Sequence, residues 1–142
     1  MRGSLALSLL NVDIVDVIKV EGEGDEYLSH KDKRPNSNGA KAILNLRSPG
    51  SKLNTIKKRI KEGTIKALLV YGENIVRFGF DENLLKGIKF MVSSHIQANP
   101  LAKLSNVILP GAGYAEKRGS MINATGRLQL LNKAIGKKLY CI

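Results

Sequence analysis

Glycines and polar residues that could contact a ligand follow three apolar segments of the chain. The segments are residues 65–71, 88–94 and 107–109, and the residues after them are Gly72-Glu73-Asn74, His95 and Gly111-Ala112-Gly113. In an open α/β sheet, ligands bind beyond the carboxyl ends of the strands. If these strands are adjacent, their ends form one edge at which backbone and side chains could bind polar groups. Turn residues also end parallel strands for purely structural reasons, so that alternative stays open.

A second candidate region is residues 106–135, in which glycines alternate with polar and apolar side chains. Gly119 and Gly126 allow close backbone approach or a positive φ angle. Asn123 and Arg127 are separated from one another by small residues and flanked by apolar ones, so the segment should be half packed and half available for hydrogen bonds. We expect Asn123 and Arg127 to tie this hairpin to the sheet through side-chain-to-backbone hydrogen bonds. The alternative is contact with a cofactor phosphate or a neighbouring subunit.

The sequence contains no recognised catalytic constellation. It has no G-x-S-x-G elbow, no P-loop and no complete G-x-G-x-x-G after a strand. Glu116 lies beside Lys117 and Arg118, which favours an ion-pairing role over acid–base chemistry. Cys141 is the single cysteine, so the chain can hold neither an internal disulfide nor a cysteine-ligated cluster. We therefore predict no catalytic residue and no metal ligand.

The charge of the chain is strongly positive and unevenly distributed. The 142 residues carry a net charge of +11, and they suffice for one domain with a real core. Residues 1–30 hold two basic and six acidic residues, whereas residues 31–142 hold 21 basic and six acidic residues. A cationic body fits nucleic acid, an anionic cofactor, an acidic protein or an anionic membrane surface, and it fits simple solubility equally. The apolar runs are too short for a membrane helix or a signal peptide.

The periodicity predicts alternating strands and helices. Strands are expected at the three apolar segments, and the third should be buried and stopped by Pro110. Helices are expected at residues 53–60, 82–86 and 100–104, the last two capped by Asp81 and Asn99. This order implies a mainly parallel sheet with right-handed crossovers. We predict an α/β fold, a three-layer Rossmann-like domain over residues 34–142, preceded by an arm and linker over residues 1–33.

The amino-terminal third gives weaker signals. Residues 5–20 favour a strand, although their length also suits a helix. Residues 21–38 have the composition of a loop, and His30 within them should be solvated. A short helix over residues 40–46 would be capped by Ser37 or Asn38.

The residues from Ala115 to Gln129, AEKRGSMINATGRLQ, resemble the signature of the molybdopterin oxidoreductase family. RPNSNGA at residues 34–40 and GTIKALLVYGEN at residues 63–74 agree with it in the right order. The closer similarity is to the large iron–sulfur subunit of bacterial NADH–quinone oxidoreductase. The resemblance implies a nucleotide-binding-like α/β domain with a structural role in a respiratory NADH dehydrogenase, part of an oxidoreductase but not catalytic alone. Its partners would be other subunits of the complex, in the cytoplasm and peripheral to the inner membrane.

In cofactor-binding members, the resemblance places one part of a molybdopterin guanine dinucleotide near Gly72, Glu73, Asn74 and His95, and it adds the signature residues Gly119, Asn123 and Arg127 as further candidates. The chain departs from the family pattern at Glu73-Asn74, at Asn106 and at Thr125. These departures favour a cofactor-free domain. The alternatives are a molybdopterin guanine dinucleotide-binding part of a formate-dehydrogenase-like oxidoreductase and a basic nucleic-acid-binding module. The low aromatic content, 5% with no Trp, argues against nucleic acid.

Overall fold

A computed structural model of the chain describes residues 9–136, and these residues form two compact units. The first unit comprises residues 9–53 and 118–131, and the second comprises residues 54–117 and 132–136. Cys141 and the first part of the predicted strand at residues 5–20 lie outside the described residues. The domain boundary predicted between residues 33 and 34 stays a prediction.

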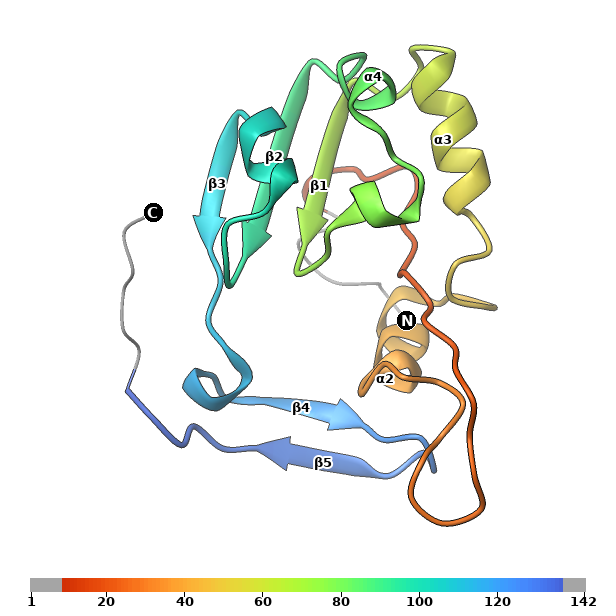
Figure 1. Cartoon of the computed structure of the whole chain (residues 1–142), viewed down its shortest axis with the longest axis vertical. Coiled ribbons are helices and arrows are strands. Elements are labelled where there is room, and N and C mark those ends of the chain that lie inside the picture. Colours follow the sequence, from red (N-terminus) through yellow and green to blue (C-terminus); the bar gives the residue numbers. More distant parts are fainter. Residues whose placement is uncertain (1–8, 137–142) are drawn as a thin grey trace. The chain divides into compact units, whose positions relative to one another are not determined.

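The second unit is built on a parallel sheet with the strand order β1-β2-β3 (Figure 1). The strands are β1 (Ala67–Tyr71), β2 (Phe90–His95) and β3 (Val107–Pro110). The predicted α/β class with a parallel sheet is therefore confirmed. The crossover from β1 to β2 contains the 3-10 helix η1 (Ile75–Phe78) and the helix α4 (Glu82–Leu85), and the crossover from β2 to β3 contains the 3-10 helix η2 (Pro100–Leu104).

The helix boundaries of this unit follow from caps that the sequence makes visible. α3 (Leu53–Lys61) buries Ile56 and Ile60 at helical spacing. The Asp81 carboxylate accepts from Leu84 N at 2.8 Å at the start of α4, a cap worth about 1 kcal/mol. Asn99 caps η2 in the same way.

The core of the second unit lies on one face of the sheet. Met91, Ser93 and His95 alternate along β2 and are buried, whereas Phe90 is 47% exposed. The prediction that β3 is buried is wrong, because all four of its residues are exposed. The apolar run at residues 107–109 correctly predicts a strand, but such a run does not show that β3 lies at an edge of this sheet.

The first unit combines a short helix with an antiparallel hairpin. α2 (Ser37–Leu44) packs against β4 (Gly119–Ile122), which pairs with β5 (Leu128–Leu131) (Figure 1). No strand forms over residues 12–20, so that prediction is wrong for the described part of residues 5–20.

The helix α2 begins three residues earlier than predicted. Its N-cap is Asn36 and not Ser37 or Asn38, which lie in the first turn. Gly39 makes this arrangement possible, because a Cβ there would lie 2.2 Å from the Asn36 side-chain oxygen. Asn45, in the left-handed conformation with φ 51°, ends the helix.

The hairpin turn provides a test of backbone conformation at two glycines. Gly126 has φ +86°, whereas Gly119 does not have a positive φ, and neither meets another atom within 4 Å of a built Cβ. Gly126→Val should lower the free energy of unfolding by about 1–2 kcal/mol, because a β-branched residue is strained in the left-handed region. Gly119→Val should leave it unchanged or raise it slightly, because Val favours strands. Urea denaturation measures both, and equal losses would contradict the assigned conformations.

Candidate functional site

The carboxyl ends of the three parallel strands are tied together by backbone hydrogen bonds. Gly72 N donates to Ser94 O at 2.7 Å, and Gly111 N donates to His95 O at 2.8 Å. These bonds extend the ladder by one residue on each side of β2. The loops that carry Gly72, His95 and Gly111 therefore lie at one edge, as expected for a parallel sheet.

Two glycines at this edge have different physical roles. Gly72 has φ +68°, and no atom lies within 4 Å of a Cβ built on it, so the space beside its backbone is open. Gly111 is packed, because a Cβ there would lie 3.0 Å from the carbonyl carbon and oxygen of His95. Gly111 thus serves the packing of the edge, while Gly72 leaves room for a ligand.

Glu73 and Asn74 are partly committed to local structure. The Asn74 side-chain oxygen accepts from Val76 N at 3.3 Å and caps η1. The Glu73 carboxylate accepts from Asn74 N at 3.2 Å. Glu73 thus places a carboxylate just after β1, where it also takes part in local hydrogen bonding.

His95 is the buried polar group of this edge. Its side chain is 6% exposed, and its Nε2 atom has no hydrogen-bond partner. Burial lowers the pKa of His95 below its ordinary value of 6.5, and the nearby negative charge of Glu73 partly opposes this shift. His95 is therefore neutral at pH 7, and its ring can accept or donate one hydrogen bond at Nε2.

The remaining predicted site residues, Gly119, Asn123 and Arg127, lie in the hairpin of the first unit. The Asn123 side-chain oxygen accepts from Thr125 N at 3.1 Å, from Thr125 Oγ1 at 2.9 Å and from Arg127 N at 2.8 Å. Asn123 thus organises its own turn, and the prediction that it ties the hairpin to the sheet is wrong. The Arg127 residue is exposed.

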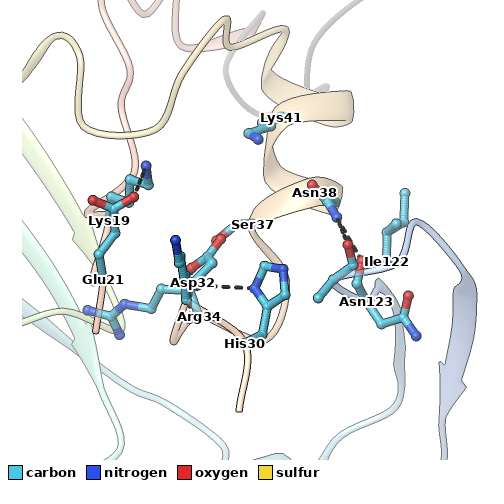
Figure 2. A pocket seen from close by; sticks show the side chains of 12 residues that line it. Lys19, Glu21, His30, Asp32, Arg34, Ser37, Asn38, Lys41, Ile122 and Asn123 are labelled. Atoms are coloured by element: carbon cyan, nitrogen blue, oxygen red, sulfur yellow. Dashed lines mark hydrogen bonds and ion pairs between the residues drawn. The ribbon is translucent and has the colours of Figure 1, made fainter. Parts of the chain in front are cut away.

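A polar cavity of about 230 Å³ lies in the first unit next to this turn (Figure 2). It is lined by residues of both charges and by polar side chains from the 19–41 segment and the hairpin, namely Lys19, Glu21, His30, Lys31, Asp32, Arg34, Ser37, Asn38, Lys41, Ile122, Asn123 and Ala124. Asn38 joins the two segments, since its side-chain nitrogen donates to Asn123 O at 2.7 Å. The cavity is therefore bounded by segments distant in sequence.

The amino terminus of α2 contributes to this cavity through Ser37 and Asn38. The Asn36 side chain does not cap the helix, because its oxygen accepts from Ile122 N at 2.9 Å. Ser37 is 5% exposed, and its hydroxyl has no hydrogen-bond partner within the described residues. Uncapped N–H groups and a positive helix end favour an anion.

The sequence pattern does not predict most of the residues that line this cavity. The composition of residues 21–38 predicts a loop, in which His30 should be solvated. His30 is exposed, but Asp32 N donates to its Nδ1 at 3.1 Å, and the ring lines the cavity. The signal that could have found the cavity is RPNSNGA, in which a serine and an asparagine open a helix between Arg34 and Lys41.

Comparison with known proteins gives a family and several relatives. The model of the molybdopterin oxidoreductase family matches residues 10–139. F420-dependent formate dehydrogenase subunit alpha of Methanocaldococcus jannaschii is 39% identical over 94 residues, which are 62% of this chain and 14% of that protein. F420-dependent formate dehydrogenase 1 subunit alpha of Methanococcus maripaludis is 35% identical over 75 residues, 50% of this chain and 11% of that protein. A putative formate dehydrogenase of Staphylococcus haemolyticus is 30% identical over 92 residues, 62% of this chain and 9% of that protein.

These relatives change the balance between the functional alternatives. They are formate dehydrogenases, which favours the formate dehydrogenase alternative over the NADH dehydrogenase interpretation. The chain covers far less than two thirds of their length.

Among residues 9–136, no helix is long and apolar enough to cross a membrane, and no three His, Cys, Asp or Glu side chains are grouped to hold a metal ion.

The burial of His95 predicts a pH dependence of stability. The unfolded chain binds a proton at His95 near pH 6.5, whereas the folded chain resists it, because the pKa of His95 is lowered by burial. The free energy of unfolding should therefore fall as the pH drops below about 6.5, and the contribution of His95 to this slope should vanish above it. His95→Gln should reduce the slope, and His30→Gln, at an exposed position, is the matched control. Urea titrations between pH 5 and 8 measure this, and an unchanged slope in His95→Gln would contradict the assignment.

Proposed function

Because the chain belongs to the molybdopterin oxidoreductase family, we propose that it forms the part of a formate-dehydrogenase-like oxidoreductase that binds molybdopterin guanine dinucleotide. The observation that carries the proposal is the open carboxyl edge of the parallel sheet, with free space at Gly72 and an unpartnered buried Nε2 atom at His95. The names of the relatives support formate as the substrate class. When bound, the cofactor would supply the molybdenum that accepts electrons from formate.

The edge of the second unit suits the nucleoside part of this cofactor. A carboxylate at Glu73 can accept hydrogen bonds from ribose hydroxyls or from the N–H groups of guanine. His95 offers one further hydrogen bond, and Gly72 lets a ring or sugar approach the backbone. A negative charge at Glu73 makes this edge a poor site for phosphates, so the nucleoside is the better fit.

The cavity of the first unit suits an anionic group. Lys19, Lys31, Arg34 and Lys41 line it together with the amino terminus of α2. Glu21 and Asp32 offset part of this charge, and Lys19 is paired with Glu21. The excess of positive charge in the cavity lining and the amino terminus of α2 favour an anion. This anion would be a phosphate of the cofactor or a carboxylate such as formate.

A matched pair of glycine variants tests nucleoside binding at the sheet edge. Gly72 and Gly63 both have φ +68°, and neither has an atom within 4 Å of a built Cβ, but Gly63 follows the helix α3. Gly72→Val and Gly63→Val should therefore strain the backbone equally. Guanosine should bind the Gly72→Val chain about tenfold more weakly, or about 1.4 kcal/mol, and the Gly63→Val chain as tightly as the wild type.

Isothermal titration calorimetry of the whole chain measures these affinities. If Gly72→Val and Gly63→Val weakened ligand binding equally, the loss of affinity would result from backbone strain and not from a lost contact between Gly72 and the ligand. A wild-type chain that binds no guanosine would contradict the proposal, and it would favour the cofactor-free structural interpretation instead.

The anion cavity is tested separately with inorganic pyrophosphate. Lys41→Gln removes a cavity cation from the exposed surface of α2 and should weaken pyrophosphate binding about threefold to tenfold at low salt. Lys103→Gln removes an exposed cation from the second unit and should have no effect. Equal affinities of the two variants would show that the cavity does not bind the anion.

A further inference from the structure

The outer edge of β5 is a row of backbone groups that meets no strand in the described chain. β5 pairs with β4 alone, in the register Gly119↔Leu131 to Ile122↔Leu128. Asn123 N donates to Arg127 O at 3.0 Å, so these two residues form a hydrogen-bonded pair. Such pairs alternate along an antiparallel ladder. The N–H and C=O groups of Leu128 and Leu130 therefore point away from β4.

The side chains of these residues are also uncovered. Leu128 is 69% exposed and Leu130 is 71% exposed, and the period of two places both on one face of the hairpin. A two-stranded hairpin is marginally stable alone. The opposite side of the hairpin is already occupied, because β4 packs against α2 and Ile122 N donates to Asn36. The outer edge of β5 is therefore the better place for an additional strand to join.

The chain segment that contains this edge carries charge of one sign. Residues 117–136 contain Lys117, Arg118, Arg127 and Lys133 and no acidic residue. Arg127 immediately precedes β5, and Lys133 lies two residues after it. An added strand would bring its own ends close to these cations, and like charges opposite each other are destabilising.

We propose that β5 is a docking edge for an extended segment of a partner polypeptide, with apolar residues at alternate positions and acidic residues at its ends. The segment would add a third strand to the β4-β5 hairpin by main-chain hydrogen bonds. Its apolar side chains would cover Leu128 and Leu130, and its acidic ends would face Arg127 and Lys133. A second copy of this chain fits poorly, because antiparallel pairing of two β5 strands would place Arg127 near Lys133 of the other copy.

Hydrogen exchange of the whole chain with two synthetic peptides tests this proposal. One heptapeptide alternates Val and Thr between terminal Asp residues, and the other has Lys in place of Asp. The Asp-flanked peptide should slow exchange at the Leu128 and Leu130 amides about tenfold or more. The amides of Gln129 and Leu131 point toward β4, and they serve as internal controls already protected without peptide. The Lys-flanked peptide should bind about threefold or more weakly at low salt, and the difference should shrink in 1 M salt.

Two variants of the same residue separate docking from folding. Leu130→Pro removes an outward N–H group that β4 does not use, so it should abolish peptide binding. Leu130→Thr keeps the N–H group and removes apolar surface, so it should weaken binding and keep the pattern of protection. Unchanged exchange at Leu128 and Leu130 with the Asp-flanked peptide would overturn the proposal. Equal binding of both peptides, or concentration-dependent protection of these amides without peptide, would overturn it as well.

Discussion

The parallel pairing of β2 with both of its neighbours is the constraint on which the candidate nucleotide site depends. The pairing fixes the register of three strands, so that Tyr71, His95 and Pro110 end at a common edge. The bonds from Gly72 and Gly111 to the backbone of β2 then set where each loop leaves the sheet. At the opposite end of the sheet, Asn106 links the starts of β2 and β3, because its side-chain oxygen accepts a hydrogen bond from Met91 N at 2.7 Å. Without this register, Glu73 and His95 would not share a surface.

The two units offer complementary chemistry. The sheet edge in the second unit presents a carboxylate, a neutral histidine and open backbone, which suit hydroxyl and amide groups. The cavity in the first unit presents several cations and an uncapped helix end, which suit an anion. Each site is assigned from its own residues, and each can be tested alone.

The elements of the second unit could be predicted from the sequence because their signals are local. Asp81 and Asn99 cap the helices that their side chains predicted, and the apolar run 67–71 forms β1. The exposure of β3 could not be predicted, because an apolar run does not show whether a strand lies at an edge. The departure from the family pattern at Asn106 has a structural explanation, because the Asn106 side-chain oxygen accepts a hydrogen bond from Met91 N. The departure at Thr125 has a similar explanation, since its hydroxyl closes the hairpin turn.

The first unit was less predictable because its site is made by long-range contacts. Asn38 and Asn123 are separated by 85 residues, and only folding places them together. Residues 21–38 have a polar composition that is typical of linkers, yet they form much of a cavity wall. The composition of a segment indicates that it lacks a local core, but it does not show that side chains distant in sequence converge on one cavity.

The most direct test of nucleoside binding at the sheet edge is a nuclear magnetic resonance titration of the ¹⁵N-labelled whole chain with guanosine. We expect saturable shifts of the amides of Gly72, Glu73 and His95 at the carboxyl edge of the sheet. The amides of Lys66 and Lys89, which lie together at the opposite end of β1 and β2, should not shift. Shifts confined to that opposite end, or no saturable shift at the carboxyl edge, would contradict the central claim.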